Sequence, residues 1–255
     1  MVNFKKHLAV FESASDYEAF KSSEEFVTPN VSLCRDEYKV HYNAKEEDVY
    51  DPFNGHAYVD LGLPSGTLWA STPLTSSEGE ALHFQWGDTE GYTETQINNG
   101  EKSFFGDGSD YKWQEGEWQE YGSSITKYNA ADGKVVLDLE DDAAHVHMGG
   151  DWHIPTKEQW QELTANTTST WTSQNGVNGM SLTSKVNGNS VFVPAFGSVT
   201  DGNVFSVGSD GFVWSSSVRE EYLSYAWYLY FSSSGLDVQN YGYRHWGHMV
   251  FGVVG

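Results

Sequence analysis

The chain has 255 residues, of which 14 are Lys or Arg and 36 are Asp or Glu, so its formal net charge is −22. This charge argues against nucleic-acid binding and against docking on an anionic membrane, because both need a cationic surface. Aromatic residues make up 15 % of the chain, whereas disordered acidic chains are poor in them. The composition therefore predicts a folded protein with one large domain, alone or with a small additional module.

The first 50 residues predict a small module of their own. Residues 31–33 and 38–42 alternate apolar and polar side chains, which is typical of a β-hairpin. Residues 16–23 have a helical composition, and the charged run 45–55, which contains Pro and Gly, is typical of a linker. The only cysteine, Cys34, lies in the hairpin, so we expect a packed thiol and no disulfide within the chain.

The amino-terminal residues lack the apolar run of a secretory signal. Only four apolar residues, 8–11, precede Glu12, whereas a signal peptide needs about 7–15 of them. No apolar stretch approaches the roughly 20 residues of a membrane-spanning helix. We expect synthesis in a bacterial cytoplasm without a signal peptide, and no membrane insertion.

The middle of the chain predicts a hairpin and then a long irregular segment. Residues 58–70 place strand-forming residues on both sides of a turn at Pro64-Ser-Gly66. Residues 90–132 are polar, with Tyr and Trp scattered among carboxylates. We expect this segment to lie on the surface without regular secondary structure.

Two helices and then many short strands follow. Residues 141–147 form a short helical pattern with acidic residues in the first turn, where the helix dipole favours them. Thr156 and Gln159 have the spacing of a capping box, and Trp160 and Leu163 share one face of the helix that follows. From residue 177 onward the pattern is β, so we predict an α+β fold.

The last forty residues are unusually rich in Tyr, Trp and His. Alternation in 226–231 predicts that Trp227, Leu229 and Phe231 point inward and that Tyr228 and Tyr230 point outward. Exposed Tyr, Trp, His and Arg together are typical of a recognition surface. The alternative is that these residues all belong to one large packed core.

Other chemistry receives little support from the residues. His145 and His147 are two apart on a predicted helix, so they do not converge with His153 on a metal. The carboxylates of residues 88–120 suggest a glycosidase, yet none of them is singled out as a catalytic acid. Motifs for nucleotide binding or an activated serine are missing. We expect no metal and no cofactor.

Five motifs, found in order over about residues 56–255, resemble the Fibrobacter succinogenes major paralogous domain family. They are 58–70 (YVDLGLPSGTLWA), 84–88 (FQWGD), 140–156 (EDDAAHVHMGGDWHIPT), 213–217 (VWSSS) and 243–247 (YRHWG). The resemblance implies a C-type-lectin-like fold that is related to the formylglycine-generating enzyme. The family usually carries Ser-Val-Arg where this chain has Met249-Val-Phe251.

The resemblance implies binding rather than catalysis. The enzyme branch needs two cysteines in its C-terminal part, and calcium-dependent lectins need Glu-Pro-Asn or Gln-Pro-Asp; this chain has neither. It looks instead like gut-bacteriophage virion proteins that retroelements diversify. By position, the exposed ligand-binding residues would be Arg219, Glu220, Glu221, Tyr222, Tyr228, Tyr230, Tyr241, Tyr243, His245, Trp246 and His248.

The expected protein is a non-enzymatic, adhesin-type receptor-binding protein on a virion surface. Residues 1–50 would attach to a virion structural protein, and residues 56–255 would present the aromatic patch to a host cell-surface protein or glycan. Two alternative roles stay open: a carbohydrate-active hydrolase that uses the acidic middle third, and a structural virion decoration protein whose aromatic patch meets another subunit. The chain could also form a homo-oligomer.

Overall fold

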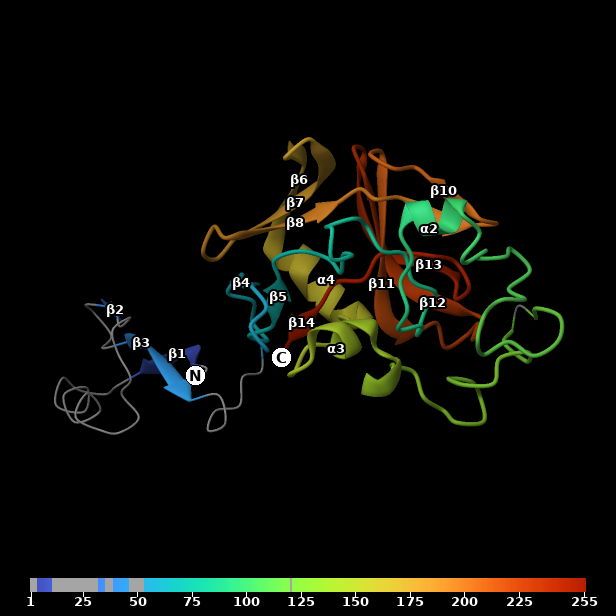
Figure 1. Cartoon of the computed structure of the whole chain (residues 1–255), viewed down its shortest axis with the longest axis horizontal. Coiled ribbons are helices and arrows are strands. Elements are labelled where there is room, and N and C mark those ends of the chain that lie inside the picture. Colours follow the sequence, from blue (N-terminus) through green and yellow to red (C-terminus); the bar gives the residue numbers. More distant parts are fainter. Residues whose placement is uncertain (1–3, 11–31, 35–38, 46–52, 120) are drawn as a thin grey trace. The chain divides into compact units, whose positions relative to one another are not determined.

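The computed structural model describes residues 4–10, 32–34, 39–45, 53–119 and 121–255, and the chain divides into two compact units, 1–51 and 52–255 (Figure 1). The first unit contains an antiparallel sheet with the strand order β1-β3-β2. Its strands are β1 (Phe4–Val10), β2 (Ser32–Cys34) and β3 (Lys39–Lys45). The β2–β3 pairing confirms the predicted hairpin. The predicted helix 16–23 and most of the predicted linker lie outside the described residues.

The second unit is a mixed fold with mostly antiparallel strands and few helices. Its first sheet has the order β14-β5-β4, its second β6-β7-β8 and its third β11-β12-β13, and β9 pairs with β10. The strands are β4 (Tyr58–Asp60), β5 (Leu68–Ala70), β6 (Thr167–Gln174), β7 (Val177–Ser184), β8 (Ser190–Pro194), β9 (Ser198–Thr200), β10 (Asn203–Phe205), β11 (Asp210–Val218), β12 (Tyr225–Ser232), β13 (Gly235–Tyr243) and β14 (Val253–Val254).

The first sheet joins the two ends of the second unit. Strands β4 and β5 form the hairpin predicted around Pro64-Ser-Gly66, with Val59 opposite Trp69. On the other side of β5, Val253 of β14 pairs with Trp69. The final strand therefore pairs although this chain lacks the Ser-Val-Arg of the resembling family.

The helices are short, and the three α-helices begin where local side chains cap them. They are α2 (Glu94–Asn98), the 3-10 turn η2 (Leu139–Asp141), α3 (Ala143–Met148) and α4 (Lys157–Asn166). The Asp142 carboxylate accepts the His145 amide at the start of α3 (3.0 Å), and Thr156 and Gln159 form the predicted capping box of α4. The two predicted helices are thus confirmed. No helix in the described part of the chain is long and apolar enough to cross a membrane.

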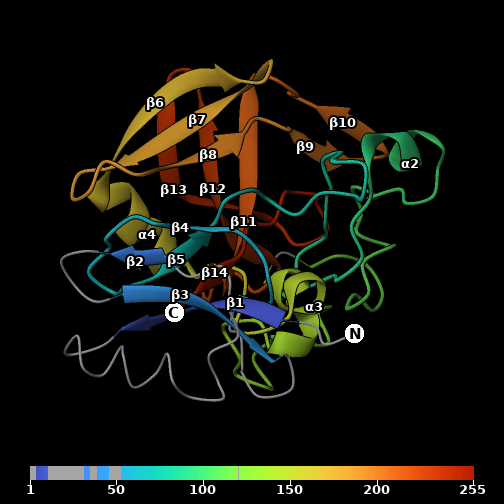
Figure 2. The same ribbon diagram turned by 60° about the vertical axis from the view of Figure 1, so that its left-hand side comes forward.

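Helix α4 packs beside the β11-β12-β13 sheet (Figure 2). Its Trp160 and Leu163 are buried. Trp160 contacts Trp69 of the first sheet, with 4.6 Å between ring centroids. Two of the buried indoles donate their N–H groups to backbone carbonyls: Trp86 to that of Ser215 and Trp214 to that of Phe84, each at 2.8 Å. The core is therefore built from large aromatic side chains placed by specific hydrogen bonds.

The segment 90–132 is irregular as predicted, apart from α2, but it does not simply lie on the surface. Phe104, Tyr111, Ile125 and Tyr128 are buried. The expectation that this segment lies on the surface is therefore wrong for these side chains. The buried aromatic side chains make the segment part of the core.

Arg244, fully buried, connects this segment to the C-terminal residues. Its guanidinium donates to the backbone carbonyls of Lys127 (3.1 Å) and Tyr128 (2.7 Å) and lies 4.6 Å from the Trp86 ring centroid. The Tyr111 hydroxyl donates to the Trp86 carbonyl (3.0 Å) beside it. A buried cation is costly unless such partners hold it, so the loop and the C-terminal residues depend on each other.

Replacing Arg244 by Ala should lower the free energy of unfolding by about 3–5 kcal/mol. The substitution leaves the Lys127 and Tyr128 carbonyls without their hydrogen-bond donor and creates a cavity. Urea denaturation followed by Trp fluorescence measures this loss. Lys185→Ala is the matched control, since Lys185 is an exposed cation that also donates to a carbonyl, that of Ala165. An equal effect of the two substitutions would contradict the role given to Arg244.

Three buried histidines predict a dependence of stability on pH. Burial lowers the pKa of His245 to about 4 and that of His248 to about 3, and it also lowers the pKa of His83. In the unfolded chain these histidines have the ordinary pKa of about 6.5. Below about pH 6.5 the unfolded chain therefore binds more protons than the folded chain. The free energy of unfolding should therefore be constant above about pH 6.5 and fall as the pH drops towards about 4. Urea titrations at several pH values test this, and a flat profile would contradict it.

Candidate functional site

Three of the eleven residues predicted to be exposed are buried. Tyr228 is only 8 % exposed, and His245 and His248 are fully buried. The prediction that these three contact a ligand directly is therefore wrong. Of the remaining eight, Glu220, Glu221 and Tyr241 are exposed, and Arg219, Tyr222, Tyr230, Tyr243 and Trp246 are half-buried.

Tyr228 is buried because the chain after β13 covers its face of the sheet. Residues 247–249 run past β11, with a parallel bridge between Val213 and Met249. A Cβ at Gly242 would lie 2.9 Å from the Trp246 ring and 3.0 Å from the Tyr228 ring, so the missing side chain makes room for both. Simple strand alternation cannot foresee this covering segment.

His248 sits among aromatic rings on that same covered face. Its ring centroid lies 4.1 Å from that of Trp214, 4.8 Å from that of Tyr228 and 5.3 Å from that of Phe212. Its Nδ1 is 2.8 Å from the Ser198 hydroxyl. The Ser198 hydroxyl also contacts the Gly247 carbonyl (3.2 Å), and both side chains are shielded from solvent. We therefore interpret this Ser–His contact as structural.

The opposite face of the same sheet carries an exposed group of aromatic side chains, which we name the aromatic platform. On this face Tyr225 of β12 is paired with Tyr243 of β13, and Trp227 with Tyr241. Tyr225 and Tyr243 stack at 4.5 Å, and Trp227 meets Tyr241 edge-on at 5.7 Å. The platform consists of Tyr121, Tyr222, Tyr225, Trp227, Tyr241 and Tyr243.

The loop between β11 and β12 and the segment 90–132 extend the platform. Tyr222 stacks on Tyr121 with 5.3 Å between centroids and meets Tyr225 edge-on at 6.2 Å. Tyr121 is 70 % exposed and Tyr241 is 41 % exposed. Behind Tyr243, the buried His245 ring stacks at 5.2 Å and is itself held edge-on by Trp118. His245 therefore supports the platform from below instead of forming part of its surface.

Two cations lie on the platform rings. The Arg219 guanidinium lies 3.5 Å from the Tyr241 centroid and 4.5 Å from the Tyr222 centroid. The Lys157 ammonium lies 3.3 Å from the Trp227 centroid. Such cation–π contacts fix the side chains in place, so the platform is ordered before a ligand arrives.

The position of α4 explains why this part of the face is open. Trp227 lies on the same face as Leu229 and Phe231, as alternation predicted, and the latter two are fully buried. Helix α4 begins at Lys157, whose side chain contacts Trp227, so Trp227 lies at the start of the helix and stays half-buried. The expectation that Trp227 is a core residue like its two neighbours is therefore wrong.

Sequence reasoning left Tyr121, Lys157, Tyr225 and Trp227 out of the predicted surface. A usable signal existed for two of them. Pairing 225–227 against 241–243 as neighbouring strands aligns two aromatic pairs on one face. Tyr121 and Lys157 belong to segments that are distant in the sequence from β12 and β13, and no local pattern predicts that they lie at the platform.

The acidic and histidine clusters show structural roles. Asp138, Glu140 and Asp141 lie close enough together to hold a metal, yet Lys127 forms an ion pair with each of them. Burial alone would raise the pKa of Asp141, but hydrogen bonds from Lys127 and Tyr128 bring that pKa below its usual value. His145, His147 and His153 are not brought together on a metal: each lies at a different backbone carbonyl.

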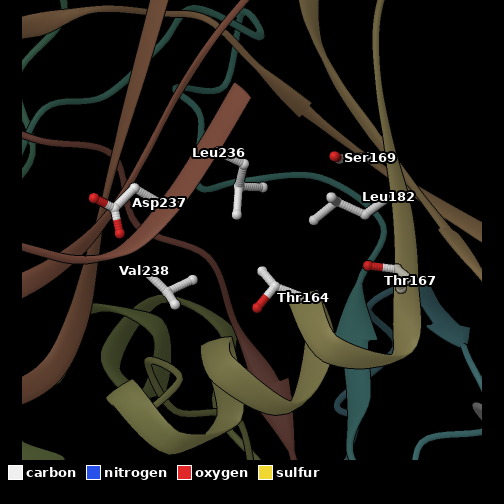
Figure 3. A pocket seen from close by; sticks show the side chains of 7 residues that line it. All are labelled: Thr164, Thr167, Ser169, Leu182, Leu236, Asp237 and Val238. Atoms are coloured by element: carbon white, nitrogen blue, oxygen red, sulfur yellow. The ribbon is translucent and has the colours of Figure 1, made fainter. Parts of the chain in front are cut away.

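A separate polar cleft of about 300 Å³ lies between the end of α4, the β6–β7 sheet and β13 (Figure 3). The hydroxyls of Thr164 and Thr167 donate to backbone carbonyls of their own helix. The Asp237 carboxylate points away from Thr167 and Leu182 in Figure 3 and accepts the Gln239 amide (2.8 Å). The polar groups of this cleft are thus used locally, and we favour the aromatic platform as the candidate site.

Comparison with models of protein families, with curated proteins and with solved structures gives no match. The function is therefore inferred from the chemistry of the residues themselves.

The division into buried and exposed tyrosines can be tested by stability. Tyr228→Ala should lower the free energy of unfolding by about 3–5 kcal/mol, because it leaves a cavity between Trp214 and His248. Tyr241→Ala should cost about 1 kcal/mol or less, since Tyr241 is 41 % exposed and its removal leaves no enclosed cavity. Equal losses in urea denaturation would show that Tyr241 is a core residue as well.

Proposed function

We propose that this chain is a non-enzymatic surface-binding protein and that the aromatic platform is its ligand-binding surface. We also propose that residues 56–255 have a C-type-lectin-like fold and belong to the Fibrobacter succinogenes major paralogous domain family. The five sequence motifs support this assignment. The pairing of β14 with the β4–β5 hairpin and the position of α3 and α4 between the hairpin and the later strands are compatible with it.

The observation that carries the binding proposal is the platform itself. Six aromatic side chains gather on one partly exposed surface, and two cations lie on the rings of three of them, Tyr222, Trp227 and Tyr241. Tyr and Trp offer a large contact area and lose little conformational entropy on binding, because each has only two side-chain torsions. A platform that is ordered in advance also keeps more of its contact energy as affinity.

The proposal assigns different roles to the two units. Residues 1–50 would attach to a virion structural protein, and the second unit would face a host cell-surface protein or glycan. The protein would then act at a virion surface as a receptor-binding or adhesin-type component. The diversified residues of related phage proteins would correspond to the exposed members of the platform.

A hydrolase role gains no specific support from the acidic segment. The Asp110 carboxylate accepts the amides of Phe104 (2.8 Å) and Phe105 (3.1 Å), so it organises a turn. Hydrogen bonds from Ser109 hold the pKa of Asp107 below its usual value, the reverse of what a catalytic acid needs. We therefore favour binding over hydrolysis.

A platform variant tests the proposal. Tyr222→Ala/Tyr241→Ala in the full chain should weaken binding to host cells at least about tenfold, because interface aromatics often contribute more than 1 kcal/mol each. Binding of the fluorescently labelled chain to a panel of gut bacteria, measured by flow cytometry, provides the readout. Unchanged binding by the variant would exclude the platform as the ligand surface.

A matched control removes two exposed aromatics outside the platform, as Tyr58→Ala/Phe105→Ala; these are 45 % and 47 % exposed. This control should bind like the wild type. Size-exclusion chromatography of the same proteins measures whether the chain associates with itself through the platform. If the wild-type chain is oligomeric and the platform variant is monomeric, a homo-oligomer or a structural decoration role is favoured over receptor binding.

A further inference from the structure

The rim of the aromatic platform is acidic. Glu158, Glu220 and Glu221 are exposed and lie next to Lys157, Arg219 and Tyr222 in the sequence, and Glu117 precedes the supporting residue Trp118. Within the described residues, Glu158 and Glu220 have no ion pair, and Glu221 has only a 3.6 Å contact with Arg219. The two cations of the site already lie on ring faces, so the rim presents an excess of negative charge.

A small pocket lies at the edge of the platform beside Trp227. It has a volume of about 160 Å³. Its walls combine the three rim glutamates with three valines and the Trp227 ring; Val135 and Val136 are 40 % exposed and Val218 is buried. Lys157 also lines it, with its ammonium on the Trp227 ring. Apolar walls with carboxylates at the edge suit a side chain that has a methylene stem and a cationic head.

The rings themselves already bind cations. Arg219 on Tyr241 and Lys157 on Trp227 show that these aromatic faces accept a guanidinium and an ammonium at 3.5 and 3.3 Å. An incoming Arg or Lys would find the same type of ring on Tyr121, which is 70 % exposed. A neutral sugar could stack on the rings and donate hydroxyl hydrogen bonds to the carboxylates, but it carries no positive charge to balance the acidic rim.

We propose that the partner of the platform is a protein segment rich in Arg or Lys, and that one of its cationic side chains enters the pocket beside Trp227. This inference rests on the proposed function, because it names the class of ligand for the same surface. Charge complementarity between the rim and the partner selects this class over a neutral glycan.

The test uses the full chain and a fluorescein-labelled peptide of alternating Gly and Arg. A second peptide carries citrulline, the neutral isostere, in place of every Arg. The Arg peptide should bind, with an affinity that falls as NaCl is raised, and the citrulline peptide should bind at least about tenfold more weakly. Fluorescence anisotropy measures both affinities.

Matched charge variants separate a specific site from general attraction to a chain of charge −22. Glu220→Gln/Glu221→Gln should weaken binding of the Arg peptide about three- to tenfold, as expected for the loss of two partly exposed ion pairs. Glu78→Gln/Glu80→Gln removes the same charge from a loop outside the platform and should leave the affinity within about twofold. Equal effects of the two double variants, or equal binding of the two peptides, would overturn the proposal.

A neutral oligosaccharide serves as the second probe, and it distinguishes failure of this inference from failure of the proposed function. If cellohexaose binds and Tyr222→Ala/Tyr241→Ala abolishes that binding, while the Arg peptide does not bind, the ligand class is wrong and the platform stands as the binding surface. If, instead, the platform variant binds host cells and both probes as the wild type does, the proposed function fails as well.

Discussion

The buried guanidinium of Arg244 is the interaction on which the arrangement of the second unit depends. Its bonds to the carbonyls of Lys127 and Tyr128 hold the irregular segment 90–132 against the residues that follow β13. Trp86 offers the cation its ring face at 4.6 Å. Tyr243 directly precedes Arg244, and Tyr121 lies only a few residues before Lys127. One buried cation therefore helps to bring together the two parts of the chain that supply the platform.

The two faces of the β11-β12-β13 sheet are used differently. On one face the residues around His248 form an aromatic cage that fills the space over Tyr228. On the other face Leu229 and Phe231 are fully buried, with Phe231 against Trp171 of β6, whereas α4 begins beside Trp227 and the rings from Tyr225 to Tyr243 stay partly open. Because α4 begins only at Lys157, the aromatic platform stays partly open on this face of the sheet.

The acidic residues also divide into two groups. Several aspartates accept backbone amides and order the loops: Asp110 at Phe104, Asp132 at Tyr128 (2.6 Å) and Asp142 at Ile154 (2.7 Å). Glutamates at the platform rim, by contrast, remain exposed with few partners. The aspartates therefore have a structural role, because they accept backbone amides in loops that lack regular secondary structure. The rim glutamates are available for interactions.

Local features were determined by the sequence alone. The hairpin at 58–70, the capping box at Thr156 and the strand pattern after residue 177 depend on neighbouring residues, and the structure confirms them. The aromatic C-terminal region was also correctly located as a partly exposed group. Which of its side chains are exposed was decided only by tertiary structure, because burial depends on what covers each face. Residues 247–249 cover Tyr228 and place His248 in the core, whereas the starting point of α4 leaves Trp227 partly open, and both contacts join segments that are distant in the sequence.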